Sequence, residues 1–356
     1  MREILNKLYN THDLEMDELV YLIENADTTI INDIKDHAKA LTLSIYGNKI
    51  YIRALLEFSN YCKRNCMYCG LRNDNEEVDR FRLTKNQIIE SIGKAYDFGY
   101  RSFVMQSGED EFYTKDLLSD IIITLKENFK GIAITLSIGE RSFEEYKEFK
   151  IAGADRFLLR HETADQKQYE KLHPDMSFEE RKRCLYDLKA LDYQVGAGFL
   201  VGLPNSNPTI MAKNLIFLKN LEPHMVGIGP LIIHKDTPLK NYKDGSVEDT
   251  LFYISLTRLF LPKAMIPVTT AVNTLDKKGL EKGIDSGGNV LMLNLSPQEL
   301  KEKYELYKNR ETKSVYDLEK VAERLENIGY QAYIKRGDHI DWSKEEEGKW
   351  QGQKMN

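Results

Sequence analysis

The stretch IRALLEFSNYCKRNCMYCGLR, residues 52–72, joins a short apolar run to three cysteines, Cys62, Cys66 and Cys69. Their spacing is C-x3-C-x2-C, and the fourth and last cysteine, Cys184, lies far away in the chain. A structural zinc site takes four ligands, usually from paired knuckles, and this chain has no second knuckle. Three thiolates on a four-iron cluster would leave one iron open to a ligand from outside the protein. The stretch therefore favours an iron–sulfur cluster, with structural zinc and three unrelated buried thiols as alternatives.

Outward from this stretch, short apolar runs alternate with amphipathic segments. The runs typical of buried strands are residues 52–58, 102–107, 132–137, 156–160, 194–202, 225–229, 265–270 and 289–294. The segments with helical periodicity are residues 84–98, 115–127, 143–152, 178–191, 208–221, 247–260 and 276–282. Near-continuous apolar strands that alternate with helices indicate a parallel sheet covered on its outside.

Eight such units predict an α/β fold, a complete (β/α)8 TIM barrel over residues 49–300. An open doubly wound sheet would carry a glycine-rich turn after its first strand, and here the cysteine loop stands in that place. The barrel is expected between a short helical extension over residues 1–48 and a C-terminal helical segment with a charged tail over residues 301–356.

The composition of the chain limits the class of protein and the cellular compartment. The chain has 356 residues, 42% hydrophobic and 30% charged, and a net charge of −6, which describes a globular protein without a strong field toward nucleic acid or anionic membrane. No apolar run reaches the roughly 18 residues that a membrane-spanning helix needs. The first residues lack a signal-peptide pattern, and three of four cysteines are clustered, so a disulfide framework is not expected. We therefore expect a reducing cytoplasm, and an exposed cluster would further imply anaerobic conditions.

Polar residues follow several strands at the end where a (β/α)8 barrel places its functional groups. Arg160 and Glu162 stand two positions apart, so their side chains point to the same side and can bind charged groups of a ligand. The adjacent hydroxyls of Thr269 and Thr270 suit an anionic substrate group, although threonine is also common in ordinary strands. Arg181, in the next helical segment, either reaches the same region or is a surface arginine. The other candidates at strand ends are Gln106, Ser107, Gly108, Glu109, Thr135 and Ser137.

Three further reactive residues are left outside this set. A lone histidine is more often a structural hydrogen-bonding residue than a ligand or a base, which leaves out His161 and His234. Cys184 lies in a helical segment and is predicted to be a buried small hydrophobic residue.

The cysteine spacing, with Tyr68 just before the last cysteine and Gly70 just after it, resembles the signature of the radical S-adenosylmethionine (SAM) superfamily. This resemblance implies a [4Fe-4S] cluster whose fourth iron binds SAM. It also implies that an electron from the reduced cluster cleaves SAM to methionine and a 5′-deoxyadenosyl radical. The available range of cluster potentials includes values low enough for such a step.

Longer strings point to one family within this superfamily. RALLEFSNYCKRNCMYCGLR, QSGED, TLSIGE, GADRFLLRHET, GAGFLVGLP, MVGIGPLIIHKDTPL and IPVTTAV, spread over residues 50–295, resemble the HydE family of FeFe-hydrogenase maturases. The resemblance implies that Cys62, Cys66 and Cys69 hold the cluster. It places Tyr68, Ser107, Gly108, Glu109, Ser137, Glu162, Arg181 and Tyr307 around SAM, and Gln106, Thr135, Arg160, Thr269, Thr270 and Met292 around the internal cavity.

The implied role is assembly of the dithiolate bridge of the hydrogenase H-cluster from a sulfur-containing, cysteine-derived iron precursor. The implied partners are this small organometallic substrate, an electron donor such as ferredoxin or flavodoxin, and other hydrogenase maturases, with no nucleic acid and no membrane. The chain lacks the C-terminal cysteines of some family members, which excludes a second cluster, and Leu293 stands where many relatives have proline.

Three alternatives stay open at this point. One is a methylornithine synthase-like mutase, and another is a biotin synthase-like enzyme, which is disfavoured because its second cluster needs cysteines that this chain lacks. The third is a non-enzymatic iron–sulfur carrier, which would need neither the Arg160–Glu162 pair nor the Ser107–Glu109 loop.

Overall fold

A computed structural model describes residues 1–310 and 313–342. Its strands are β1 (Lys49–Ser59), β2 (Ser102–Ser107), β3 (Ala133–Ser137), β4 (Arg156–Leu158), β5 (Gln194–Ala197), β6 (Leu200–Val201), β7 (Met225–Val226), β8 (Gly229–Pro230), β9 (Val290–Asn294) and β10 (Gln331–Tyr333). The helices are α1 (Arg2–Thr11), α2 (Met16–Asn25), α3 (Thr28–Tyr46), α4 (Lys85–Asp97), α5 (Lys115–Asn128), α6 (Phe143–Ala152), α7 (Gln166–Leu172), α8 (Phe178–Ala190), α9 (Pro208–Leu221), α10 (Val247–Phe260), α11 (Thr270–Leu275), α12 (Gly279–Asp285), α13 (Gln298–Lys301) and α14 (Leu318–Glu326).

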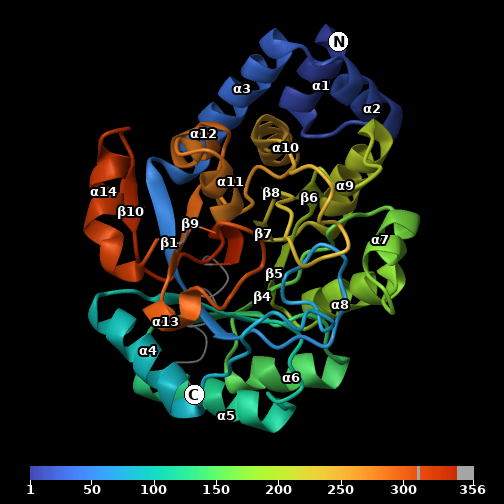
Figure 1. Ribbon diagram of the computed structural model, residues 1–356. Coiled ribbons are helices and arrows are strands. Elements are labelled where there is room, and N and C mark those ends of the chain that lie inside the picture. The colour runs from blue at the N-terminus through green and yellow to red at the C-terminus, as the bar shows by residue number, and fades with distance from the viewer. Residues whose placement is uncertain (311–312, 343–356) are drawn as a thin grey trace.

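The parallel strands close into a barrel, as the alternating pattern predicts. β1, β2, β3, β4, β5 and β7 pair in that order, and β9 pairs with β1. Two parallel bridges, from Met225 to Met265 and from Pro267 to Val290, join β7 to β9 through the segment between them. The ring of backbone contacts is thereby complete (Figure 1).

The seventh predicted strand, residues 265–270, differs from the expectation. It forms only the two bridges at Met265 and Pro267, and Thr270 already begins α11. Proline has no N–H to donate, so a regular ladder cannot continue through Pro267. The backbone still contacts both neighbours, with the Met265 N–H 2.8 Å from the His224 carbonyl and the Val268 N–H 2.9 Å from the Val290 carbonyl.

The fifth and sixth predicted strands are each broken in two, into β5 and β6 and into β7 and β8. The break falls at Gly198, whose φ is +147°. A Cβ at this position would lie 1.9 Å from the carbonyl oxygen of Gly227, so only glycine permits this close approach of the two chains. β6 and β8 then pair with each other beyond the main sheet.

Side-chain alternation separates an outer core from the barrel interior. Phe103 and Met105 of β2 belong to the apolar core that also contains helix residues, so Gln106 faces the interior. On β3, Ile134 lies in the same outer core and Thr135 faces inward. Polar inward residues therefore line the interior while the outward faces bury the helices.

Helices α1–α3 form an additional layer rather than part of the barrel. α2 packs on α9, and α3 packs on α10 and α12, so this layer covers the outer helices at the top of Figure 1. α3 ends at Gly47, where φ is +62°. Within the described ranges, no helix is both long and apolar enough to cross a membrane.

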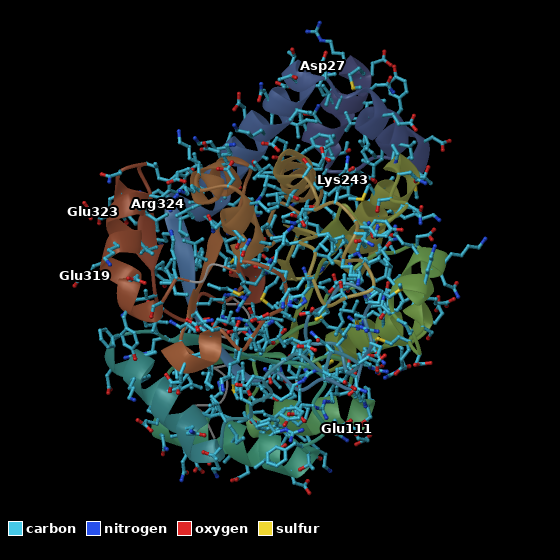
Figure 2. All side chains as sticks on the ribbon, in the orientation of Figure 1. Asp27, Glu111, Lys243, Glu319, Glu323 and Arg324 are labelled. Carbon is cyan, nitrogen blue, oxygen red and sulfur yellow. The ribbon has the colours of Figure 1, made fainter. Side chains whose placement is uncertain are left out.

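The C-terminal segment adds a strand that sequence periodicity missed. After α14, β10 pairs in parallel with the start of β1, with Gln331 opposite Lys49. The following residues cross the end of the barrel opposite the cysteine loop, where Asp338 lies 2.5 Å from Arg156. Figure 2 shows Glu319 and Glu323 extending outward from α14. The charged tail predicted at the C-terminus falls on residues 343–356, which lie outside the described residues.

Candidate active site at the barrel mouth

The cysteine loop follows β1 and is fixed by backbone hydrogen bonds to separate segments. The Met67 N–H donates to the carbonyl of Leu172 at 2.9 Å, at the end of α7. The Gly70 N–H donates to the carbonyl of Leu306 at 3.0 Å, in the segment after α13. The Lys63 N–H donates to the carbonyl of Glu109 at 3.0 Å, in the loop after β2. The loop is therefore built into the mouth of the barrel.

The three thiols are poor anions by themselves. Burial raises the pKa of Cys62, and raises that of Cys69 to about 12. The pKa of Cys66 is raised by burial first and then by the neighbouring Cys69 and Cys62. Thiolates at these positions need a nearby positive charge, which a bound iron–sulfur cluster would supply.

The structural-zinc alternative finds no support in the placement of the cysteines. Among the residues that the structure describes, no three His, Cys, Asp or Glu side chains are grouped so as to hold one metal ion.

Gly108 brings the loop after β2 directly onto the cysteine loop. A Cβ at Gly108 would lie 2.3 Å from the carbonyl oxygen of Tyr61 and 2.6 Å from Cβ of Cys62. The adjacent Glu109 N–H points to Sγ of Cys62 at 3.4 Å. This backbone donor is one of the few polar groups on the cysteines, and a donor to sulfur favours the thiolate.

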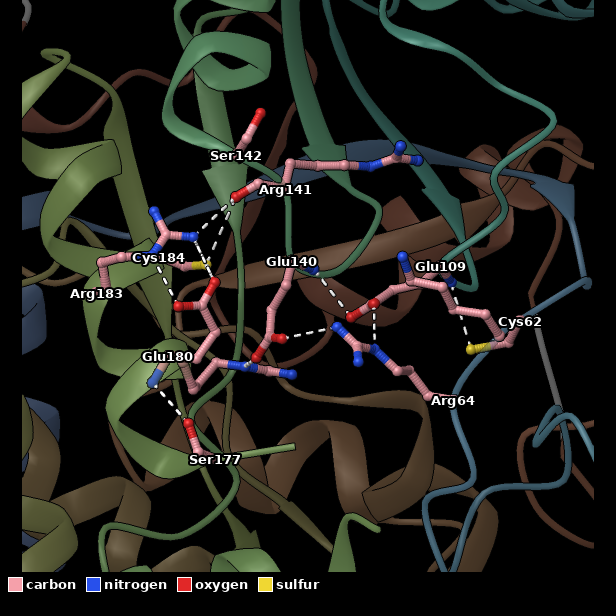
Figure 3. Close-up of polar contacts among 12 residues, drawn as sticks. Cys62, Arg64, Glu109, Glu140, Arg141, Ser142, Ser177, Glu180, Arg183 and Cys184 are labelled. Atoms are coloured by element: carbon pink, nitrogen blue, oxygen red, sulfur yellow. Dashed lines mark hydrogen bonds and ion pairs between the residues drawn. The ribbon is translucent and has the colours of Figure 1, made fainter. Parts of the chain in front are cut away.

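A buried ion-pair network holds the cysteine loop against the loops after β2 and β3. Nε of Arg64, a residue of the cysteine loop, lies 2.5 Å from Oε2 of Glu109, and its Nη2 lies 2.9 Å from Oε2 of Glu140. Oε1 of Glu140 accepts from Nε of Arg181 at 2.8 Å. Figure 3 shows Arg64 between Glu109 and Glu140, with Cys62 on the far side of Glu109.

This network determines the positions of the Arg181 and Glu109 side chains. Arg181 is 7% exposed, so the surface-arginine alternative is wrong. Its Nη1 donates to the carbonyl of Arg160 at 2.5 Å, which links α8 to the end of β4. The carboxylate of Glu109 is held by Arg64 and by the Glu140 N–H, at 2.9 Å, which leaves the backbone of residues 107–109 as the part of this loop nearest the cysteines.

Tyr68 is positioned by a histidine that sequence reasoning did not select. Its hydroxyl lies 2.8 Å from Nε2 of His173, while Nδ1 of His173 lies 2.7 Å from the carbonyl oxygen of Tyr169. A carbonyl only accepts, so Nδ1 carries the proton and Nε2 accepts from the Tyr68 hydroxyl. Burial lowers the pKa of His173 to about 3, which keeps this arrangement neutral.

The barrel interior contains buried polar atoms with no hydrogen-bond partner among the described residues. They include Oγ1 of Thr135 and Thr269 and Oε2 of Glu162. Nε of Arg160 lies 3.2 Å from Oε1 of Glu162, whose φ is +62°. Unpartnered buried groups are costly, so these atoms take their hydrogen bonds from water or from a polar ligand in the interior.

A second interior arginine adds positive charge deeper in the barrel. Arg53 of β1 is 3% exposed, and its Nη1 contacts Sδ of Met225 at 2.7 Å. Its Nε and Nη2 have no partner among the described residues, and burial lowers its pKa, followed by repulsion from Arg156. Sequence reasoning missed Arg53, Arg64, Glu140 and His173. Two of them could have been found from the sequence: Arg53 from the alternation of inward and outward residues along β1, and Glu140 from its position just after β3.

The remaining predicted residues occupy varied positions. Ser137 pairs in register with Gln106 at the mouth ends of β3 and β2. The Ser107 hydroxyl donates to the carbonyl of Gly108 at 2.7 Å. Burial raises the pKa of Tyr307, which lies beside Arg310. Thr270 and Met292 line a cavity of about 290 Å³ between β9, α11 and α14. Thr270 is the first residue of α11 and not, as predicted, the end of a strand.

The three reactive residues that were left outside the candidate site are all buried. His161 is fully buried against Phe199 and Phe217, and its Nδ1 lies 3.4 Å from the Gly198 N–H. His234 is buried beside Gly70. Cys184 is fully buried in α8, as predicted.

The fold and the mouth together define a class of protein: a β/α barrel with three cysteines on the loop after its first strand. The sequence profile of the Radical SAM superfamily matches residues 56–215. The [FeFe] hydrogenase maturase subunit HydE of Thermotoga maritima is 42% identical over 306 residues, which cover 86% of this chain and 83% of that protein. The chain therefore belongs to the HydE family of the radical SAM superfamily, which implies a [4Fe-4S] cluster and SAM as its cofactors.

Other enzymes of the superfamily are more distant. The 3-methylornithine synthase of Methanosarcina acetivorans is 26% identical over 324 residues, 91% of each chain. The crystal structure of a methylornithine synthase superposes with a TM-score of 0.82 at 25% identity and covers 93% of this chain and 97% of that one. The overall fold is therefore shared with a methylornithine synthase.

Proposed function

We propose that this protein is a radical SAM enzyme of hydrogenase maturation that acts on a sulfur-containing, cysteine-derived iron precursor in assembly of the dithiolate bridge of the H-cluster. The observation that supports it is that the cysteine loop and the unpartnered polar atoms of the interior share one mouth. The other end of the barrel is closed by Asp338 against Arg156, 2.5 Å apart. A substrate inside the barrel therefore meets the cofactor at the open end.

Cys62, Cys66 and Cys69 would hold the cluster, and when bound the reduced cluster and SAM supply a 5′-deoxyadenosyl radical. The protein's own contribution is placement. Gly108 lets the backbone of residues 107–109 approach the cysteine loop without a side chain between them. Tyr68 is oriented by His173, and the pair Arg160–Glu162 presents both charges at the same mouth, with Nε and Oε1 3.2 Å apart.

The interior selects an anionic substrate. Arg53 has two nitrogens without partners in the described part of the chain, and Arg160 follows the end of β4. The hydroxyls of Thr135 and Thr269 are free to donate to the same ligand. Such cations and donors bind carboxylate, thiolate or cyanide-bearing groups through charge-assisted hydrogen bonds. We expect the electron to come from a reduced ferredoxin or flavodoxin, and the product to pass to other hydrogenase maturases.

A methylornithine synthase-like mutase is the second candidate, because that fold superposes with a TM-score of 0.82. It shares the radical cofactor but acts on an amino acid without iron. Product analysis therefore separates the two, and cofactor cleavage alone does not.

The test is anaerobic. The protein is reconstituted with iron and sulfide, reduced with dithionite, and given SAM with and without the iron precursor. We expect 5′-deoxyadenosine with wild type and with Cys184→Ser, and none with Cys66→Ser. We also expect that adding the protein to maturase-depleted extract restores hydrogenase activity. No 5′-deoxyadenosine from a fully loaded cluster would refute the radical SAM chemistry, and cleavage without restored hydrogenase activity would refute the maturase assignment.

A further inference from the structure

A second depression lies at the closed end of the barrel, away from the cysteine loop. Its cavity of about 580 Å³ is lined by residues at the end of α3, the start of β1 and the start of β2, and by β10 with the segment after it. We call this the basal pocket, defined by Tyr46, Tyr51, Tyr333, Lys49, Arg101 and Lys335. Its size is that of a small-molecule site, and the proposed reaction makes no use of it.

The basal pocket carries an excess of positive charge. Lys49, Arg101 and Lys335 form no ion pair with any described carboxylate. The other charged residues of its wall, Arg336 and Asp338, are paired with each other at 2.7 Å, and Asp338 also pairs with Arg156. In a protein of net charge −6, three uncompensated cations around one depression favour an anionic ligand.

Aromatic rings form the other wall of this pocket. The rings of Tyr51 and Tyr333 meet edge to face with centroids 5.1 Å apart, and those of Tyr46 and Tyr51 with centroids 5.8 Å apart. Nζ of Lys49 lies 5.5 Å from the centre of the Tyr333 ring, so cation and ring adjoin. Burial, followed by the neighbouring Tyr333, raises the pKa of Tyr51, which keeps its hydroxyl a neutral donor. Tyrosine faces at a partly open site suit stacking with a flat ring.

Two features hold the wall in place without a ligand. β10 is registered on β1 with Tyr333 opposite Tyr51. Gly337 has a φ of +59°, and a Cβ there would lie 2.8 Å from the ring of Tyr51, so the chain passes directly beside this ring. The cations and the rings are thus presented by a paired strand and a tightly packed segment, not by a loose loop.

We propose that the basal pocket binds a nucleotide, with the base against Tyr51 and Tyr333 and the phosphates between Lys49, Arg101 and Lys335. Phosphates match the unpaired cations, and a base matches the aromatic wall, so one ligand accounts for both. The site is separate from the SAM site and independent of the radical chemistry at the mouth. Because the segment that forms its wall also carries Asp338, a bound nucleotide would stabilise the closure of the barrel end.

The experiment titrates the full-length, cluster-loaded protein with ADP, pyrophosphate or adenosine, with SAM in excess so that the mouth is filled. Binding is followed by calorimetry and by the rise in Tm. We expect ADP to bind more tightly than pyrophosphate and adenosine to bind most weakly. The double variant Lys49→Gln/Lys335→Gln is expected to weaken ADP about tenfold or more, because each loses a charge-assisted contact. Lys243→Gln, at an exposed lysine of another loop, is the matched control and is expected to leave binding unchanged.

Tyr333→Leu separates the two halves of the ligand. It is expected to weaken ADP about tenfold through lost stacking and to leave pyrophosphate unchanged, with Tyr242→Leu as the exposed control. Absence of ADP binding to the wild type at millimolar concentration would overturn the proposal. So would equal binding of ADP and pyrophosphate with no effect of Tyr333→Leu, or an unchanged affinity in the lysine double variant. SAM cleavage is expected to be normal in all these variants, so failure here is distinct from failure of the proposed function.

Discussion

Glu140→Gln tests whether the buried ion-pair network holds the barrel mouth together. One carboxylate of Glu140 joins two arginines, Arg181 at 2.8 Å and Arg64 at 2.9 Å, and its side chain is 5% exposed. With Glu109 on Arg64 at 2.5 Å, the network contains two positive and two negative charges. Glutamine keeps the shape of the side chain, removes one negative charge and turns one acceptor into a donor that faces a guanidinium.

The expected loss follows from the burial of both partners. Removing one member of a buried ion pair costs about 3–5 kcal/mol, since the remaining charge stays buried and uncompensated. With an unfolding entropy of about 2.1 cal/mol/K per residue, 356 residues give about 0.75 kcal/mol/K. The Tm of Glu140→Gln is therefore expected to fall by about 4–7 °C.

The assay is thermal unfolding of the apoprotein by circular dichroism at a fixed scan rate. Glu111→Gln is the matched control, because Glu111 forms an ion pair with Lys63 at 2.9 Å but its side chain is 73% exposed. Figure 2 shows Glu111 at the lower edge of the molecule. An exposed pair contributes little, so the control is expected to melt with the wild type. If Glu140→Gln melts with the control, the network does not stabilise the mouth and the reasoning is refuted.

Three further outcomes are expected. Gly108→Ala should lower the amount of iron bound on reconstitution, because the new Cβ would lie 2.3 Å from the Tyr61 carbonyl oxygen. Gly93→Ala in α4 is the control and should leave the iron content unchanged. Equal iron contents in the two variants would contradict the close-approach argument. His173→Phe should raise the SAM concentration for half-maximal 5′-deoxyadenosine formation at normal iron content, and an unchanged value would show that Tyr68 needs no orienting partner. Burial lowers the pKa of His161 to about 3 and of His224 to about 4. Both histidines take up protons in the unfolded chain below about pH 6.5, whereas in the folded protein they stay neutral to lower pH. The free energy of unfolding should therefore be highest above about pH 6.5 and should fall toward pH 4 by up to about 1.4 kcal/mol per pH unit for each histidine. Urea unfolding midpoints at pH 7.5 and pH 5.5 would show this fall, and equal midpoints would contradict it.

The outer elements were predictable because their signals are local. The predicted bounds of residues 143–152, 208–221 and 247–260 match α6, α9 and α10. Each of these helices follows a residue that caps its first turn, as Ser142 does by accepting from the Glu145 N–H. The parallel strands β2, β3 and β9 were predicted within one residue, since near-continuous apolar runs are typical of buried parallel strands.

Features that depend on distant residues were not predictable in this way. The fifth predicted strand is interrupted at Gly198 because the backbone of Gly227 approaches it closely. The short strand β10 forms by pairing with the start of β1, which is far away in the sequence. In the site, strand ends marked Arg160 and Glu162, which form an ion pair. The partners of Arg181 and Tyr68 come from other loops, and a single sequence contains no signal for such pairs.

Ion pairs connect the cysteine loop to the neighbouring loops at the mouth of the barrel. Arg64 stands between Cys62 and Cys66 in the sequence, and its guanidinium is held by carboxylates from the loops after β2 and β3. The loop after β1 is thus tied through Glu140 and Arg181 to the carbonyl of Arg160 at the end of β4. Four consecutive units of the barrel therefore share one chain of hydrogen bonds that begins within the cysteine loop and ends at the carbonyl that follows β4. Arg181 and Glu140 therefore join the end of β4 to the cysteine loop, in addition to the backbone hydrogen bonds that Lys63, Met67 and Gly70 donate to other segments.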